Sequence, residues 1–382
     1  MTEVIQTTAP AATALAAYLA ADLAASNAAL PYTLVAYLGT LTPQQLDATE
    51  AETGALLLGA AVHDLGWLRR VALRGEDRFR WLSGMVTNAV ETLPGQSGAY
   101  SLVLNAQGRI QGDAYVWRNR NANGDALEVE VTQEQSDALL AHFDHFIIMD
   151  DVELAPVSGQ SALGVTGPKA SEIIAKLGLP ELAGELSCSA GVIGGIPVQL
   201  YRSYGTIVPH YQIWVASEQI PALWNALRGA GATPVGAASL EVLRIAEGIP
   251  AYGIDIQSRD LAQETAQMRA ISFTKGCYLG QEIVERIRSR GQVHRHLRAL
   301  ELTAEPGAEL PAAGAELRVS GSNAGAKPAG AITSITVLQL GGARRIFAIA
   351  MIRSEAEVGH VALQYPGGTA RILHAPPNLA EI

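Results

Sequence analysis

The segment TKGCYLGQE (Thr274–Glu282) contains Cys277, one of only two cysteines in a chain of 382 residues. The sequence continues with IVERIRSRG, in which apolar residues recur at helical spacing before a glycine. This pattern predicts a helix that begins near Gly280 and ends at Gly291. Cys277 should therefore lie on the loop that enters the helix, where unpaired N–H groups favour a thiolate.

The residues around Cys277 allow two interpretations. Lys275 lies two positions earlier, on the same side of an extended chain, and would also favour the thiolate. On this interpretation Cys277 and Lys275 are candidate catalytic residues. Alternatively, Cys277 is a small buried hydrophobic side chain beside a turn. Spacing alone leaves both interpretations open.

A basic run follows the same segment. Between positions 286 and 298 the chain has five arginines and two histidines but no acidic residue. On a protein of net charge −10, this run predicts a local positive field that suits a polyanion. The alternative is a solvated helix end whose cations complement the helix dipole. The predicted anion-binding patch consists of Arg286, Arg288, Arg290 and Arg295.

Composition limits the classes of protein that fit. The chain has 27 basic and 37 acidic residues, which argues against a general nucleic-acid coat. Two cysteines, Cys188 and Cys277, are too few for a disulfide scaffold or a zinc site, so a reduced cytoplasmic protein is expected. The alanine-rich N-terminal segment lacks a basic region and is interrupted by Asp22, so neither an export signal nor a membrane span is expected.

The order of patterns along the chain predicts an α+β protein of four parts. Residues 1–45 should form a helical extension, with a second helix starting at the Thr42-Pro43 pair. Residues 46–155 and 156–290 each mix helices with strands. Residues 291–382 show short alternating strands separated by Gly, Pro and Asn, which predicts an antiparallel β-barrel or sandwich.

Other candidate binding residues are scattered. Asp113 follows a predicted hairpin turn, and Glu247, Tyr252 and Asp255 lie near glycines in RIAEGIPAYGIDI. Carboxylates beside an aromatic ring can bind a flat heterocycle by hydrogen bonds and stacking. Such residues are more often turn formers or surface charges. The histidines show no metal-ligand spacing, and no phosphate-binding or nucleophile-elbow motif is present, so no metal site is predicted.

Taken together, these segments resemble the YgfZ-like proteins, folate-binding relatives of the glycine-cleavage aminomethyltransferase that assist iron–sulfur enzymes. KGCYLGQE is similar to their K-G-C-[FY]-x-G-Q-E signature. Further similarity lies, in order, in LRGEDRFRWLSGMVTN, NAQGRIQGDAYVW, FDHFIIMDDVEL, ALGVTGPKA and RIAEGIPAYGIDI. The resemblance covers the chain from about Ala55 onward.

The resemblance implies an aminomethyltransferase-like folate-binding fold, with two α+β domains around a central channel and a C-terminal β-barrel. It also implies tetrahydrofolate as the cofactor, and iron–sulfur client enzymes, some of them tRNA-modifying, as partners. It gives Cys277 a role in maintaining those enzymes. The predicted cofactor-binding residues are Asp113, Tyr278, Gln281, Glu282, Glu247, Tyr252 and Arg244.

Three positions depart from the transferase pattern. Gly112 stands where the transferase has a second aspartate, Gln212 replaces a folate-side glutamate, and Leu240 replaces a basic residue. Because pterin N–H groups bind carboxylates, these changes weaken folate recognition. The missing aspartate also argues against aminomethyl transfer, which needs an acid or base beside the folate nitrogen.

Three hypotheses follow. The leading one is a folate-dependent accessory protein for assembly or repair of iron–sulfur enzymes that acts through Cys277. The second is a tetrahydrofolate-dependent one-carbon transferase. The third is a non-catalytic module that binds tRNA or a protein through the arginine patch.

Overall fold

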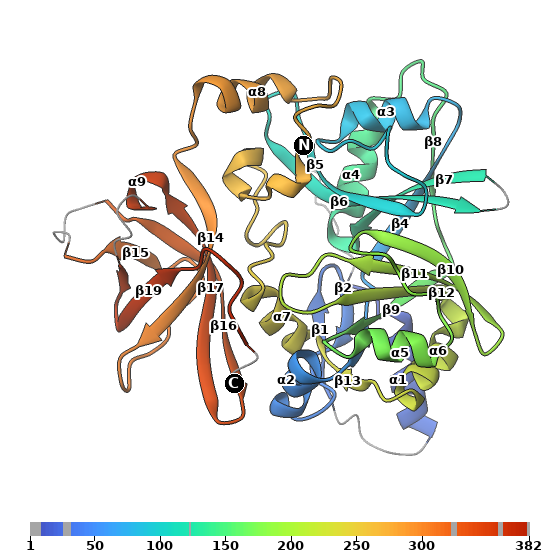
Figure 1. Ribbon diagram of the computed structural model, residues 1–382, viewed down its shortest axis with the longest axis horizontal. Helices are drawn as coiled ribbons and strands as arrows, with labels where there is room; N and C mark the ends of the chain where they lie inside the picture. The colour runs from blue at the N-terminus through green and yellow to red at the C-terminus, as the bar shows by residue number, and fades with distance from the viewer. Residues whose placement is uncertain (1–8, 26–31, 122–123, 322–326, 358–361, 380–382) are drawn as a thin grey trace.

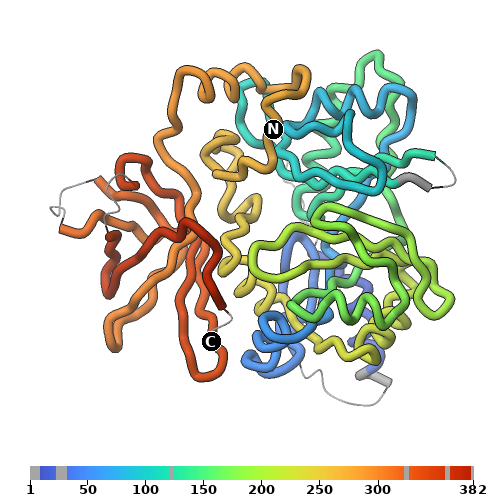
Figure 2. Tube along the Cα trace, viewed as in Figure 1, coloured from blue at the N-terminus to red at the C-terminus, as the bar shows by residue number. Residues whose placement is uncertain are grey.

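The computed structural model describes residues 9–25, 32–121, 124–321, 327–357 and 362–379. Figure 1 shows two α+β units stacked on one side of the molecule and a β-barrel on the other, with the chain from α7 to α8 between them. The same arrangement is seen in the Cα trace of Figure 2. The predicted α+β class with a C-terminal barrel is therefore confirmed.

The two α+β units share one sheet of eleven strands, in the order β13-β3-β9-β12-β11-β10-β5-β6-β7-β4-β8. Neighbouring strands are antiparallel except β13 and β3. The two halves of the sheet join where β10 meets β5, through the single pair Ser187 and Ser97.

The first half contains the predicted hairpin and the helices that cover it. Its elements are β4 (Leu68–Arg74), α3 (Arg78–Met85), β5 (Ser97–Leu104), β6 (Ile110–Asn121), β7 (Gly124–Thr132), α4 (Gln133–His145) and β8 (Glu153–Pro156).

The second half is formed mostly by the chain that follows. Its elements are β3 (Ala61–Asp64), β9 (Gln160–Thr166), α5 (Ala170–Lys176), β10 (Ser187–Ile193), β11 (Ile196–Ser203), β12 (His210–Ala216), α6 (Ile220–Gly229), β13 (Thr233–Val235) and α7 (Ala237–Ala246). Short 3₁₀ turns occupy Ser217–Gln219, Ala262–Thr265 and Met268–Ala270.

The last part of the chain forms a closed barrel in the order β14-β17-β16-β15-β18-β19. Alternating apolar residues fill its interior, as the pattern of short strands predicts. The helix α8 (Gln281–Arg290) precedes it, and its elements are β14 (Arg295–Ala304), β15 (Glu316–Val319), β16 (Gly330–Leu340), β17 (Ala343–Arg353), α9 (Ser354–Glu357), β18 (Leu363–Tyr365) and β19 (Gly368–Ile372).

The N-terminal extension is only partly helical. The helix α1 (Ala14–Ala25) agrees with the prediction, whereas β1 (Leu34–Tyr37) and β2 (Thr40–Pro43) form a hairpin. The helical prediction is wrong there because LVAY favours a strand and Gly39 turns the chain at φ 90°. The predicted helix start at Pro43 instead ends β2, and α2 (Thr49–Leu58) begins later. The helix predicted over residues 1–8 and 26–31 lies outside the described residues.

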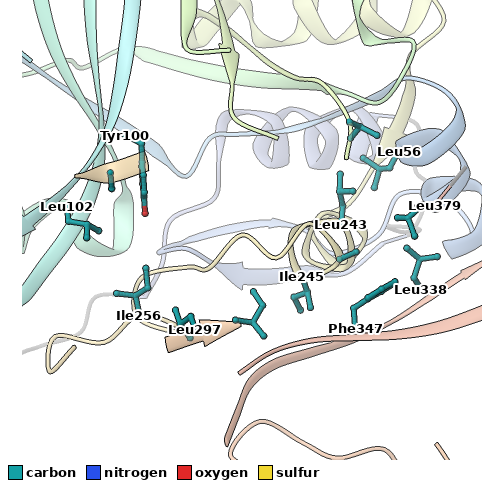
Figure 3. Close-up of a cluster of buried hydrophobic side chains, with 14 of the residues drawn as sticks. Leu56, Tyr100, Leu102, Leu243, Ile245, Ile256, Leu297, Leu338, Phe347 and Leu379 are labelled. Carbon is teal, nitrogen blue, oxygen red and sulfur yellow. The ribbon is translucent and has the colours of Figure 1, made fainter. Parts of the chain in front are cut away.

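A hydrophobic core joins the barrel to the α+β units (Figure 3). Leu243 and Ile245 of α7 lie in the same buried cluster as Leu338 and Phe347 of the barrel and Leu56 of α2. Because this core is continuous, the barrel fixes the position of α7, which forms one wall of the cavity described below. Among the described residues, no helix combines the length and apolar character needed to cross a bilayer.

Candidate functional site

A central cavity of about 270 Å³ lies where the two halves of the sheet meet the hairpin β1–β2 and the helix α7. Strand alternation explains why polar side chains reach it: Asp113 and Tyr115 share one face of β6, and His210 and Gln212 share one face of β12. Tyr37 from the hairpin and Trp67 add an aromatic wall, with ring centroids 4.9 Å apart.

Asp113 is a hydrogen-bond acceptor inside this cavity. Its Oδ2 accepts from the Tyr100 hydroxyl at 2.7 Å, and its Oδ1 accepts from Gln135 Nε2 at 2.8 Å. Burial raises the pKa of this carboxyl above its ordinary value. A carboxylate has about four acceptor positions, so two remain for N–H groups of a ligand.

The position beside Asp113 is closely packed by side chains of α4. Gly112 faces the opposite side of β6, where a Cβ atom would lie 2.7 Å from both Gln135 Oε1 and Leu139 Cδ1 of α4. A side chain at position 112 would therefore require the ends of the Gln135 and Leu139 side chains, or α4 itself, to shift. The packing of the helix on the sheet thus disfavours a second aspartate at this position.

A buried ion pair of the first half of the sheet lies next to the cavity and contacts the second half. Arg70 donates to Glu130 Oε2 at 2.7 Å and lies between the rings of Tyr201 and Trp214, at 3.9 and 4.0 Å from their centroids. Gln212 Nε2 donates to Glu130 Oε1 at 2.9 Å. The side-chain amide of Gln212 thus links the two halves of the sheet. Both carboxylate oxygens of Glu130 already accept hydrogen bonds from Arg70 or Gln212.

Two further predicted residues line the cavity with their polar atoms already engaged. Glu247 accepts from the backbone amides of Thr206, Ile207 and Val208 and from His210 Nε2. Each N–H group of Arg244 also donates to one of five acceptors. They are two oxygens of Glu241, Asp255 Oδ2, the carbonyl of Ile249 and Ser334 Oγ.

The engagement of Arg244 explains its position in the fold. Its guanidinium joins α7 to the barrel strand β16, and Asp255, at 2.7 Å, is fully buried. Leu240, the third departure from the transferase pattern, lies one turn earlier on α7 and gives the cavity an apolar wall.

Cys277 lies on the loop before α8, as predicted, and its side chain is exposed. The alternative of a buried side chain is therefore wrong for Cys277, although it describes Cys188. Gly280, with φ 81°, turns the chain into the helix. Among the described residues Cys277 is absent from the cavity lining, so the thiol and the cavity are separate places.

Lys275 points away from solvent and holds the end of α3. Its ammonium donates to the carbonyl of Ser83, and to that of Val86 at 2.6 Å, and it lies 4.7 Å from the Tyr278 ring centroid. Burial lowers the pKa of this ammonium to about 8. These contacts give Lys275 a structural role as a cap on carbonyls that the helix leaves unpaired.

The other predicted cofactor-binding residues lie outside the cavity. Tyr278 is buried in the core, and Gln281 Oε1 accepts from its backbone amide at 3.3 Å. Glu282 is exposed in the first turn of α8, and Tyr252 is half-buried in the loop after α7. Of the seven predicted cofactor-binding residues, the cavity therefore brings together Asp113, Arg244 and Glu247.

The predicted arginine patch divides into two parts. Arg286, Arg288 and Arg290 are exposed on α8, and Arg288 also lies 4.5 Å from the Phe273 ring centroid. Arg295 instead turns inward to pair with two carboxylates, at 2.8 and 3.0 Å. The exposed positive surface therefore contains only three of the four arginines of the predicted patch.

Several residues that line the cavity were not predicted from the sequence. His63, Thr166, His210 and Glu130 come from four different strands, and no local spacing connects them. The only local signal was the alternation HYQIW, which places His210 on the same strand face as Gln212. Within the described part of the chain, no group of three or more His, Cys, Asp or Glu side chains is arranged to hold a metal ion.

Comparison with known structures agrees with this architecture. The crystal structure of glycine cleavage system aminomethyltransferase T from Bartonella henselae superposes with a TM-score of 0.76 at 19% identity, covering 91% of this chain and 94% of that one. The fold is therefore an aminomethyltransferase-like fold.

The family follows from the sequence comparison. The model of the GCVT N-terminal domain matches residues 7–275, and the chain belongs to this family. It is 26% identical to a putative chloroplastic transferase of Arabidopsis thaliana, over 70% of this chain but 63% of the plant protein. It is 28% identical to an aminomethyltransferase of Rubrobacter xylanophilus, over 80% of this chain and 81% of that protein.

Proposed function

We propose that this protein is a YgfZ-like accessory factor that binds a reduced folate in the central cavity and supports iron–sulfur enzymes through Cys277. The observation that carries the proposal is the exposed thiol on a loop outside the cavity. A thiol in that position is accessible to another protein, whereas a thiol inside a cavity of about 270 Å³ would reach only a small ligand.

The folate part of the proposal depends on Asp113. Its two free acceptor positions suit the N–H groups of a pterin ring, and the aromatic and apolar walls suit the flat faces of that ring. A bound folate would supply one-carbon chemistry. The chain itself would contribute the carboxylate that orients the ring.

A one-carbon transferase is the second candidate, and one observation favours it. Burial raises the pKa of Asp113, and a carboxyl of raised pKa can act as a general acid or base. The packing at Gly112 weighs against this candidate, because a second carboxylate there would have to displace the Gln135 and Leu139 side chains.

The exposed face of α8 supports a partner close to the thiol. Arg286, Arg288 and Arg290 follow Cys277 within a few turns, and they suit an acidic protein surface or the phosphates of tRNA. Because such binding is electrostatic, it should weaken as salt rises.

Complementation in cells that lack the protein tests this function. Cys277→Ser should abolish the rescue of iron–sulfur enzyme activity, including tRNA methylthiolation, and Asp113→Asn should reduce it. Thr274→Ala, an exposed change on the same loop, is the matched control and should rescue fully. Full rescue by Cys277→Ser would remove the thiol from the mechanism.

A further inference from the structure

A chain of hydrogen bonds crosses one wall of the cavity and links four side chains. His63, Thr166 and His210 belong to the adjacent strands β3, β9 and β12, and Glu247 caps the end of α7. All four line the cavity. Gly164 makes the arrangement possible, because a Cβ atom there would lie 2.0 Å from His63 Cε1.

At one end of this hydrogen-bond chain, the contact with a backbone carbonyl determines the tautomer of His63. Its Nδ1 lies 3.0 Å from the backbone carbonyl oxygen of Asp64, which can only accept, so Nδ1 carries a proton. Burial lowers the pKa of His63 to about 4, so the ring is neutral near pH 7 and its Nε2 is an acceptor. Thr166 Oγ1, at 3.0 Å, must therefore donate its hydroxyl proton to His63.

The other end fixes the proton on His210 Nε2. Three backbone amides hold Glu247 Oε1, and His210 Nε2 lies 2.9 Å from Glu247 Oε2. This surrounding of donors suits a carboxylate, which can only accept, so we assign the proton of the contact with Glu247 to His210 Nε2.

In the middle of this hydrogen-bond chain, the contact between Thr166 and His210 bears on whether Nδ1 of His210 carries a proton. Thr166 has a single hydroxyl proton, and that proton goes to His63. At 3.4 Å the contact between Thr166 Oγ1 and His210 Nδ1 is long, and it is a hydrogen bond only if His210 donates. That arrangement would place a proton on each nitrogen of His210 and a positive charge on its ring, balanced by Glu247.

We propose that His210 is the cationic, proton-donating residue of the cavity and that it binds a carboxylate or carbonyl oxygen of the ligand through Nδ1. His63, Thr166 and Glu247 are positioning residues that hold the two protons on its ring. This assignment rests on the proposed function only in taking the cavity as the ligand site. It adds that the ligand must present N–H donors to Asp113 and an oxygen acceptor to His210.

Two observations favour His210, among the four hydrogen-bonded side chains, as the residue that contacts the ligand. Its side chain is 21% exposed, whereas that of Glu247 is 1% exposed and Thr166 is 1% exposed as a residue. Its contact with Thr166 is also the longest of the chain. A ligand oxygen at shorter range would therefore replace Thr166 as the acceptor for Nδ1.

Nitrogen-15 NMR of the imidazole rings in the unliganded protein tests the assignment without any folate. At pH 7 we expect His63 as the neutral Nδ1–H tautomer and His210 with both nitrogens protonated. Thr166→Val keeps the shape but removes the hydroxyl, so it should remove the proton from His210 Nδ1. His294→Gln, on the surface, should leave both signals unchanged. A neutral His210 or an Nε2–H tautomer of His63 in the wild type would overturn the assignment.

Titration with 5-formyltetrahydrofolate provides the ligand test. Binding should shift the His210 Nδ1 signal, and His210→Gln should weaken affinity by roughly 10-fold or more, as for loss of a charge-assisted hydrogen bond. Folate binding that leaves the His210 signals unchanged would refute the ligand contact. A charged His210 in a protein that binds no folate would uphold the charge assignment and refute the proposed folate function.

Discussion

The cavity and the Cys277 loop differ in how their polar groups are satisfied. In the cavity, Asp113, Glu130 and Glu247 each accept at least two hydrogen bonds from buried or half-buried partners. On the loop, Cys277 is exposed, and its neighbour Lys275 is turned inward onto the backbone of α3.

This difference suits the two kinds of recognition that we propose, of a small ligand and of a macromolecule. A cavity whose donors and acceptors are fixed in advance binds a small ligand at low entropic cost. An exposed side chain on a loop can be reached by a macromolecule, and its loop positions it without shielding it. Substitutions in each region test whether the two regions are as different as their packing indicates.

The largest effect is expected at the buried ion pair beside the cavity. Arg70→Met should destabilise the protein by about 3–5 kcal/mol, because it leaves Glu130 buried without its cation. Urea denaturation measures this loss. As a control, Arg371→Met removes an arginine that is 73% exposed and should cost less than about 1 kcal/mol. Equal losses for both variants would show that the Arg70–Glu130 pair contributes no more to stability than an exposed ion pair.

The pH dependence of stability should reveal His63. Burial lowers the pKa of its folded state to about 4 from the ordinary 6.5, so the unfolded chain takes up a proton first as the pH falls. Stability is therefore lost between pH 6.5 and pH 4, by about 3 kcal/mol in total. His63→Phe should remove this component, measured as the difference in unfolding free energy from the wild type at several pH values. An unchanged pH profile in the variant would contradict the buried neutral state.

A side chain at position 112 should be moderately destabilising. Gly112→Asp places a carboxylate against Gln135 and Leu139 of α4, and we expect a loss of about 1–3 kcal/mol from overpacking. Thermal unfolding followed by circular dichroism measures the change. A variant as stable as the wild type would mean that α4 yields easily and that a second carboxylate could be accommodated.

The smallest effect on stability is expected at the thiol. Because Cys277 is exposed, Cys277→Ser should change the unfolding free energy by less than about 0.5 kcal/mol. Denaturation by urea, run beside the Arg70 variant, checks this. A loss above about 1 kcal/mol would indicate that the side chain packs against something, and it would remove the contrast with the cavity.

The sequence predicted the features that local patterns encode. The start of α8 at Gly280, the hairpin of β5 and β6, and the strands of the barrel all follow from spacing within about twenty residues. The hairpin β1–β2 was missed because a run of alanines suggested that helix would continue through Val35.

The cavity network could not be predicted in the same way. His63, Thr166, His210 and Glu247 meet only because three strands are neighbours in the sheet and the barrel holds α7 in place. Likewise, Lys275 seemed to support the thiol because it is close in sequence, but the carbonyls of α3 attract its ammonium. Contacts that depend on tertiary packing leave no mark in local spacing.

Isothermal titration with 5-formyltetrahydrofolate tests most directly whether the cavity and the thiol are independent. Four proteins should be compared: the wild type, Asp113→Asn, Cys277→Ser, and Asp137→Asn as an exposed carboxylate control on α4. We predict equal affinity for the wild type, Cys277→Ser and Asp137→Asn, and affinity weakened roughly 10- to 100-fold for Asp113→Asn. Equal binding by Asp113→Asn, or loss of binding in Cys277→Ser, would contradict the account.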